Sequence, residues 1–324
     1  MSTRSHILST GSYLPEKIMT NHDLSKIVET SDEWIFQRSG IKSRRIAADN
    51  QSTSDMAVEA AKAAMQRADI QASDIDGIIV ATTTPDQTFP SVAVRVQAAL
   101  GVPVCIAFDV QAVCSGFIYA LSVADNFIKV GQLKRVLVIG ADKMSSILDW
   151  SDRTTCVLFG DGAGAVILDA YEGAGNGDDT GILSTHLYAN GTMRDLLYTD
   201  GGVSTTGESG HIVMQGRDVF KHAVRLMADA VNAALDANNL SADQIDWLVP
   251  HQANLRIIES TAKKLSMPME RVIVSVETHG NTSAASIPLA FDGAVREGKI
   301  KKGDLVLFEA LGGGLTWGSA LLRL

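Results

Sequence analysis

One cysteine stands where a nucleophile is expected. Cys114 follows a strand predicted over residues 104–109 and opens an apolar helix predicted over residues 115–130. Unpaired N–H groups and the dipole at a helix amino end favour the thiolate, which is the attacking form, over the thiol. This placement favours covalent catalysis at Cys114, against the alternative of a small buried apolar residue. For Cys105 and Cys156 we adopt that alternative, and three cysteines without a Cys-x-x-Cys pair predict no disulfide framework.

A histidine and an asparagine follow two other predicted strands. His251 comes after residues 245–249, and Asn281 comes after residues 272–276. Active sites gather at the carboxyl ends of strands in α/β sheets, and imidazole and amide groups both donate hydrogen bonds to a developing oxyanion. The pattern favours a catalytic pair, with a structural histidine and a helix-capping or turn asparagine as alternatives. The seven histidines show no metal-ligand spacing, so no metal site is predicted.

Two glycine-rich runs could bring backbone close to a ligand. Residues 312–314 are three consecutive glycines after a predicted strand, which lets their N–H groups turn toward an oxyanion. A plain tight turn is the alternative. Residues 160–164 depart from the GxGxxG spacing and precede an aliphatic run instead of a helix, so we predict no nucleotide-phosphate site there.

These residues need a scaffold of strands and helices. β-branched runs alternate with helical patterns, which predicts an α/β fold with a largely parallel sheet covered on both faces. The predicted strands are 77–82, 104–109, 135–141, 245–249, 272–276, 304–309 and a last one ending at Leu324, and the predicted helices are 54–68, 91–100, 115–130, 218–237, 255–266 and 283–297.

The chain contains an internal repeat. Residues 70–80 are similar to residues 240–250 at an offset of 170, and Cys114 and Asn281 hold matching places at an offset of 167. Chance similarity of amphipathic segments is the alternative, but three consecutive pairs of elements keep their order and spacing. Residues 171–181, rich in glycine and acids, predict a loop between the copies. We expect two halves, 1–172 with the nucleophile and 173–324 with the histidine and amide, whose equivalent loops meet in one cleft.

Charge and hydropathy exclude several classes of function. The 324 residues carry a net charge of −9, which opposes binding to nucleic acid or to anionic lipid. No apolar stretch approaches the length of a membrane span, and the first ten residues lack the apolar core of a secretory signal. We expect a cytoplasmic protein with no membrane and no nucleic-acid partner.

Taken together, the motifs resemble those of the thiolase-like condensing enzymes, and specifically the β-ketoacyl-acyl-carrier-protein synthase III family. The matching segments are residues 30–35 (TSDEWI), 113–117 (VCSGF), 159–164 (FGDGAG), 249–257 (VPHQANLRI), 279–284 (HGNTSA) and 312–318 (GGGLTWG). The resemblance implies a duplicated five-layer α-β-α-β-α fold with two mixed sheets, and a homodimer. It also implies no cofactor, because acyl-CoA is a substrate.

The resemblance assigns a reaction to these residues. An acyl group, expected to be acetyl, would pass from acyl-CoA to Cys114, with N–H groups of Cys114 and Gly313 as the oxyanion hole. His251 and Asn281 would then serve the decarboxylation of malonyl-acyl-carrier protein, whose enolate attacks the acyl-cysteine. The product would be a 3-oxoacyl-acyl-carrier protein, formed at the start of type II fatty-acid synthesis. The amide of Asn281 favours this class over its relatives. A second cysteine at that position would resemble thiolases, and a second histidine would resemble the elongating synthases.

Further site residues are expected around this triad. The resemblance implies CoA-binding residues, which are Trp34, Arg38, Arg153, Asn254 and Gly216. The expected liners of the acyl pocket are Phe89, Leu148, Met214 and Leu311. The acidic carrier protein needs a basic patch, and helical spacing favours Lys221, Arg256, Lys263 and Lys264. Solvated surface charge is the alternative for this last set.

Three other functions stay open at the level of sequence. The chain could be a condensing enzyme of secondary metabolism that uses the same triad on another acyl donor or acceptor. It could be a cysteine hydrolase that releases free acid, or a scaffold that binds the carrier protein without catalysis. Residues 190–210 predict either a mobile lid or a simple excursion.

Overall fold

The computed structural model describes residues 2–174 and 179–324. Two sheets form its framework. The first has the order β1-β7-β6-β4-β5 and consists of β1 (Ser2–Tyr13), β4 (Gly77–Ala81), β5 (Ile106–Val110), β6 (Arg135–Lys143) and β7 (Asp161–Gly173). The second has the order β11-β12-β13-β8 and consists of β8 (Gly181–Ala189), β11 (Trp247–Pro250), β12 (Leu305–Gly312) and β13 (Thr316–Arg323).

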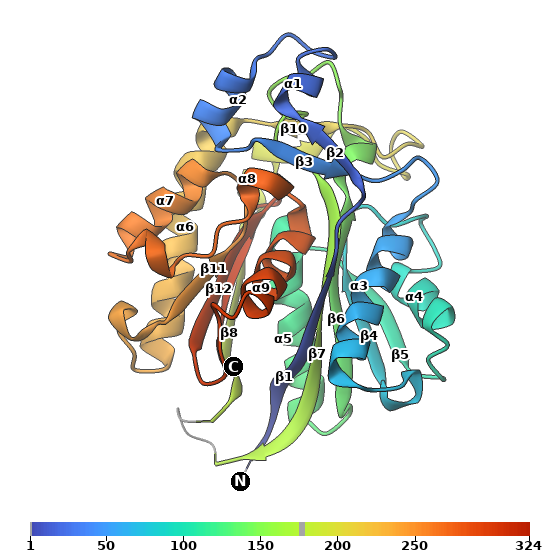
Figure 1. The fold of residues 1–324 in the computed structure, drawn as a ribbon, viewed down its shortest axis with the longest axis vertical. Coiled ribbons are helices and arrows are strands. Elements are labelled where there is room, and N and C mark those ends of the chain that lie inside the picture. The colour runs from blue at the N-terminus through green and yellow to red at the C-terminus, as the bar shows by residue number, and fades with distance from the viewer. Residues whose placement is uncertain (1, 175–178) are drawn as a thin grey trace.

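The helices complete five layers, as the resemblance implied (Figure 1). The outer helices α3 (Thr53–Ala68) and α4 (Val92–Leu100) cover one face of the first sheet. The central helices α5 (Gly116–Lys129) and α9 (Ser286–Arg296) pack between the sheets. The outer helices α6 (Gly216–Ala237) and α7 (Leu255–Lys264) cover the far face of the second sheet. Because α5 meets a sheet on both sides, its sequence is apolar on nearly every face until the last turn.

The sheets are mixed, not largely parallel. Strand β4 pairs in parallel with β5 and β6, as the alternation of strands and helices predicted. Strand β7 runs antiparallel to β1 and β6, and β13 runs antiparallel to β12 and β8. Each half thus adds antiparallel strands to a short parallel core.

The two halves share one register, which explains the internal repeat. Gly77 of β4 pairs with Val136 of β6, and Trp247 of β11 pairs with Val306 of β12, so both partners are offset by 170 residues. The central helices carry buried carboxylates at Asp125 and Asp292, offset by 167.

The strand predicted over residues 272–276 is wrong. Val272 forms a single bridge with Leu248, and Val276 already begins α8 (Val276–His279). The side-chain oxygen of Gln252 accepts hydrogen bonds from the backbone N–H groups of Ser275 and Val276, which would otherwise be available to a strand ladder. A distant side chain therefore overrides the β-branched pattern here.

The two predicted loops are shorter than expected. Tyr171 belongs to β7 and Gly181 begins β8, and residues 175–178 of that predicted loop lie outside the described residues. The segment 190–210 contains a 3₁₀ turn, Gly191–Leu196, and strand β9 (Leu197–Thr199), which pairs with β10 (Ile212–Met214).

Four small elements lie over the carboxyl ends of the sheets (Figure 1). They are β2 (Lys17–Thr20), α1 (Asn21–Leu24), α2 (Asp32–Ser39) and β3 (Ser43–Ile46). No helix in the described part of the chain is long and apolar enough to cross a membrane. Within residues 2–174 and 179–324 there is also no group of three or more His, Cys, Asp or Glu side chains placed to hold a metal ion.

Candidate active site

Cys114 and Asn281 stand in equivalent turns of the two halves. Each follows a residue in the left-handed region, Val113 with φ of +48° and Gly280 with φ of +67°. A 3₁₀ turn then leads into the central helix, through Val113–Ser115 to α5 and through Ser283–Ala285 to α9. A β-branched residue at positive φ costs about 1–3 kcal/mol and marks functional sites, so the turn before the cysteine is strained where the nucleophile is presented.

These two turns contact each other, which brings residues 167 positions apart into one site. Cys114 and Asn281, together with His251 from the loop after β11, line a single cavity of about 770 Å³. The three groups that the sequence singled out for chemistry therefore face the same space. They come from opposite halves of the molecule.

The position and tautomer of His251 follow from its neighbours. Its ring is buried, and burial lowers the pKa from 6.5 to about 3, so the imidazole is neutral. Nδ1 lies 2.6 Å from the hydroxyl oxygen of Ser286, which also accepts the backbone N–H of Gln252. The Ser286 proton is then free to point at Nδ1, which places the histidine proton on Nε2. His251 thus presents a neutral N–H donor to the cavity.

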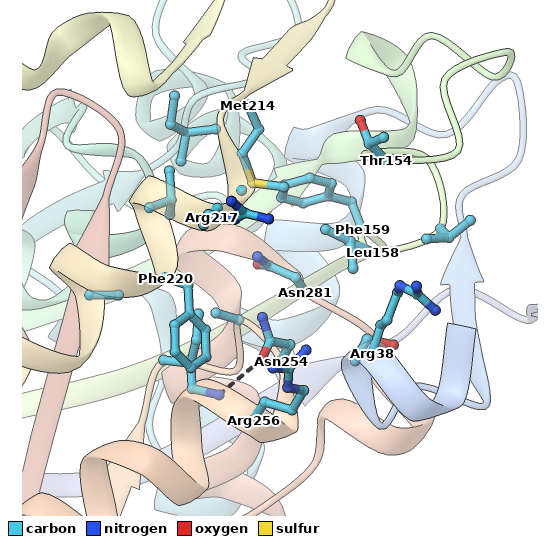
Figure 2. A pocket seen from close by; sticks show the side chains of 18 of the residues that line it. Arg38, Thr154, Leu158, Phe159, Met214, Arg217, Phe220, Asn254, Arg256 and Asn281 are labelled. Carbon is cyan, nitrogen blue, oxygen red and sulfur yellow. Dashed lines mark hydrogen bonds between the residues drawn. The ribbon is translucent and has the colours of Figure 1, made fainter. Parts of the chain in front are cut away.

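Asn281 is oriented in the same way. Its side-chain oxygen accepts the backbone N–H of Ser283 at 2.9 Å, which leaves the amide NH₂ as the exposed end. Its backbone is held against the segment before β7 by two bonds, from its own N–H to the Leu158 carbonyl and from the Gly160 N–H to its own carbonyl. Figure 2 shows Asn281 in the wall of the cavity, with Phe159 and Met214 on one side and Asn254 and Arg256 on the other.

The thiol of Cys114 departs from the sequence-based expectation. We expected the helix amino end to favour the thiolate. Instead, burial raises the pKa of Cys114 to about 12, and the nearby Ser283 hydroxyl offsets only part of that increase. The sulfur lies inside the protein, and removal of water disfavours the charged thiolate. The resting enzyme therefore holds a thiol, and the proton must leave as the sulfur attacks.

The glycine turn closes over the cysteine. A Cβ atom on Gly312 would lie 2.8 Å from the Cys114 backbone nitrogen and 2.7 Å from the Ala112 carbonyl oxygen, so only glycine permits this approach. Gly313 and Cys114 line the same second cavity, of about 270 Å³. The backbone of residues 312–314 thus lies against the backbone of Cys114.

All five predicted CoA-binding residues line the larger cavity. They are Trp34, Arg38, Arg153, Asn254 and Gly216. The guanidinium groups of Arg38 and Arg153 lie 4.4 Å and 5.2 Å from the centre of the Trp34 ring. Asn254 caps α7, since its side-chain oxygen accepts the Ile257 N–H. Charge and an aromatic face at one mouth suit a nucleotide with phosphates.

Two of the four predicted acyl-pocket residues line a cavity and two do not. Met214 and Leu311 line the larger cavity. Two of these predictions are not supported: Leu148 is buried in the core and lines neither cavity, and Phe89 is 80% exposed in the turn before α4. The second cavity is instead walled by Met144, Ile147, Phe159, Leu197 and Ile212, with Thr83 among its polar members. Sequence reasoning missed most of these, since they carry no motif.

The basic residues are spread along two helices. Arg256 lines the cavity and its guanidinium lies 5.6 Å from the Phe220 ring. Lys221 is exposed on α6, one turn beyond Arg217, which also lines the cavity. Lys263 and Lys264 are exposed in the last turn of α7, at the end of the helix opposite Arg256. Of the four predicted carrier-protein residues, Arg256 alone stands at the cavity.

Ser283 and Ser286 are functional candidates that sequence reasoning did not select. The Ser283 hydroxyl lies near the Cys114 thiol and lowers its pKa, and the Ser286 hydroxyl contacts Nδ1 of the His251 ring. The signal was present as a Ser-Ala-Ala-Ser run directly after the asparagine motif, but small polar residues at a helix start have the ordinary meaning of a cap.

The matching family models and two curated relatives carry the same description. A family model described as 3-oxoacyl-[acyl-carrier-protein (ACP)] synthase III matches residues 108–191, and the model of its C-terminal part matches residues 235–324. The β-ketoacyl-[acyl-carrier-protein] synthase III of Rhodospirillum centenum is 62% identical over 323 residues, and that of Paramagnetospirillum magneticum is 60% identical over 324, each comparison covering 100% of both chains.

Solved structures agree with this similarity. The 3-oxoacyl-[acyl-carrier-protein] synthase III of Aquifex aeolicus is 50% identical, with a TM-score of 0.93 over 99% of this chain and 100% of the other. The priming β-ketosynthase of the R1128 polyketide pathway is 34% identical, with a TM-score of 0.93 over 100% and 97%.

Proposed function

This chain belongs to the 3-oxoacyl-[acyl-carrier-protein] synthase III family, and from that premise we propose that Cys114, His251 and Asn281 perform its condensing reaction. The protein is a condensing acyltransferase in the initiation of fatty-acid synthesis. A role in secondary metabolism is less supported, because relatives at 56–62% identity over the whole chain are synthases III. One observation carries the assignment of residues, namely a thiol and two neutral donors lining one cavity.

The first step of the proposed reaction loads the enzyme. The sulfur of Cys114 attacks the thioester carbon of an acyl-CoA, and the N–H groups of Cys114 and Gly313 hold the oxyanion. Such a donor is worth about 3–4 kcal/mol in the transition state. The CoA thiolate leaves and takes the proton that the Cys114 thiol gives up, while His251 stays neutral. The product is an acyl-cysteine, and no cofactor is needed beyond the substrate.

The second step forms the carbon–carbon bond. A malonyl thioester on the carrier protein loses CO₂, and its enolate oxygen accepts hydrogen bonds from His251 Nε2 and the Asn281 amide. Both groups are neutral donors, which suits an enolate that must remain nucleophilic. The enolate carbon attacks the acyl-cysteine carbonyl, the carbon–sulfur bond breaks, and the Cys114 thiolate takes a proton from water to restore the thiol. The orientations set by Ser286 and Ser283 support this division of labour.

The two cavities suggest where each substrate part binds. We propose that the larger one admits the CoA and carrier-protein arms past Trp34 and Arg153, and that the smaller one holds the acyl chain. A basic mouth formed by Arg217 and Arg256, with Lys221 beside it, would receive the acidic carrier protein. The smaller cavity, of about 270 Å³, has a largely apolar wall, which suits an acyl chain.

We also propose a homodimer in the cytoplasm, each chain made of halves 1–172 and 173–324. Strand β5 is the edge of the first sheet, and the exposed side chains of Phe89 and Val104 lie on segments beside it. Unpaired edges with apolar neighbours favour pairing with a second copy. Three free thiols favour a reducing compartment. Light scattering of the purified protein tests the dimer.

Intact-mass analysis tests the core of this proposal. After mixing with acetyl-, butyryl- or octanoyl-CoA, the protein should gain the mass of one acyl group, fastest with the short chains. Peptide mapping should place it on Cys114. The Cys114→Ser variant should gain no stable acyl mass, whereas the Cys156→Ser control should behave as the unsubstituted enzyme. Release of free acid without a lasting acyl-enzyme would instead establish a hydrolase.

A further inference from the structure

Arg44 is a buried cation whose hydrogen-bond partners are all neutral. It lies on β3 with 0% of its surface exposed. Its guanidinium donates to the Met19 carbonyl at 3.2 Å, to the Asn21 side-chain oxygen at 2.9 Å and to the Val157 carbonyl at 2.6 Å. Its Nε has no partner among the described residues. Burying a charge without an opposite charge beside it is costly, so its retention calls for a specific role.

One end of this side chain supports the backbone that carries Asn281. Cβ atoms added to Gly160 and Gly280 would lie 3.0 Å and 3.1 Å from the Arg44 Cβ, so the arginine packs against both glycines. Gly280 precedes Asn281, and Gly160 donates its N–H to the Asn281 carbonyl. Arg44 also donates to the carbonyl of Val157, two residues before Phe159, which forms an isolated β-bridge with Asn281. Arg44 therefore contacts both backbone segments that hold Asn281, namely residues 157–160 and Gly280.

The other end leads to the mouth of the cavity. Asn21 accepts from Arg44 and donates its amide to the carboxylate of Asp32 at 2.8 Å, and to the Ile41 carbonyl at 2.7 Å. Asp32 begins α2, the helix that carries Trp34 and Arg38. The Asn21 amide thus bridges the Arg44 guanidinium and the Asp32 carboxylate. Figure 1 shows β3 and α2 together above α8, the helix that leads into the asparagine turn.

We propose that Arg44 is a positioning residue that holds the Asn281 amide in its productive place and ties that place to the CoA-binding helix α2. The inference rests on the proposed role of Asn281 in decarboxylation. Arg44 touches no substrate, and acts through the bridge between residues 157–160 and Asn281. The two half-reactions should therefore respond differently to its loss, because acylation of Cys114 does not use Asn281.

The test measures both half-reactions in Arg44→Lys and Arg44→Met. Lysine keeps the charge but offers one donor point instead of the planar fork, so it cannot serve Val157, Met19 and Asn21 together. Loss of register by a fraction of an ångström to 1 Å can lower a rate by about 100-fold. We expect kcat for condensation with malonyl-carrier protein to fall by about 10- to 100-fold, with KM for the carrier substrate almost unchanged. At saturating acetyl-CoA the rate of Cys114 acylation should remain close to normal, because a change at α2 acts on CoA binding and not on the thiol.

Controls separate positioning from general damage. Arg45→Lys changes the neighbouring arginine, which is partly exposed and donates to Pro15, and should alter neither half-reaction. Thermal unfolding of every variant is recorded, and if Arg44→Met does not fold, Arg44→Lys decides. Equal losses in both half-reactions, or an unchanged condensation rate in Arg44→Lys, would overturn the proposal.

A last variant distinguishes this inference from the function on which it rests. Asn281→Ala should lose condensation and keep acylation. If it keeps condensation, the role of Asn281 is wrong whatever Arg44 does. If Asn281→Ala behaves as expected and Arg44→Lys does not, only the role of Arg44 is wrong.

Discussion

The hydroxyl of Ser286 lies 2.6 Å from Nδ1 of His251, and this contact decides which ring nitrogen faces the cavity. Ser286 is the first residue of α9, while His251 follows β11, so the pair joins the asparagine turn to the histidine loop. Replacement by alanine leaves Nδ1 without this partner and frees the proton to occupy either nitrogen.

We therefore expect Ser286→Ala to lower condensation by about 10- to 100-fold, because the Nε2–H donor to the enolate is no longer fixed. The measurement is the rate of CO₂ release from malonyl-carrier protein by the acylated enzyme. Ser122→Ala, which removes a buried hydroxyl from the equivalent helix α5, is the matched control and should leave the rate unchanged. A normal rate in Ser286→Ala would show that the tautomer is set elsewhere.

The pH dependence of acylation follows from the neutral imidazole of His251. His251 has a pKa lowered to about 3, so its imidazole remains neutral down to about pH 5. The rate of Cys114 acylation, followed by intact mass, should show no acid-side loss with a midpoint near 6.5, the ordinary value for imidazole. A midpoint there would mean that the histidine becomes charged in the working enzyme.

Arg256 should serve the carrier protein and not CoA chemistry. Its guanidinium stands at the cavity beside Phe220, so charge reversal would oppose an acidic partner. We expect Arg256→Glu to raise KM for malonyl-carrier protein by about tenfold and to leave self-acylation by acetyl-CoA almost intact. Lys302→Glu makes the same change in charge at the opposite end of β12 and should do neither. Equal damage to both half-reactions would contradict the assignment.

Glu309 gives a prediction about stability. This carboxyl is buried on β12, its two oxygens have no hydrogen-bond partner among the described residues, and burial raises its pKa from 4.5 to about 8. The unfolded chain loses this proton above pH 4.5 while the folded chain keeps it, so the free energy of unfolding decreases as pH rises from 4.5 through about 8.

Glu309→Gln removes that titration. We measure the free energy of unfolding by differential scanning calorimetry at pH 5 and pH 8. The difference between Glu309→Gln and the unsubstituted protein should be more favourable to the variant at pH 8, by about 1.4 kcal/mol for each pH unit over which Glu309 resists ionisation. Glu259→Gln, on the exposed face of α7, should show no such difference. The same offset from the unsubstituted protein at both pH values would contradict a buried neutral carboxyl at Glu309.

Sequence alone was sufficient for the main helices and the reactive groups, but it did not predict the strands β1, β7 and β8. Local pattern determines where a helix begins, so α3, α5, α6, α7 and α9 lie where the periodicity predicted them. The repeat at offsets of 167 and 170 determined that Cys114 and Asn281 occupy equivalent turns. Cysteine, imidazole and amide at strand ends indicated the chemistry because few residue types can perform it.

Only the tertiary structure decided how those groups are tuned. The thiol has a raised pKa because packing from both halves removes water from it, which no helix amino end can reveal. Residues 272–276 fail to form a strand because Gln252 takes their N–H groups, and Phe89 lies exposed outside the pocket. Ser286 and Arg44 act on residues far away in the chain. Protonation, tautomer and register depend on such neighbours, and folding alone determines which neighbours meet.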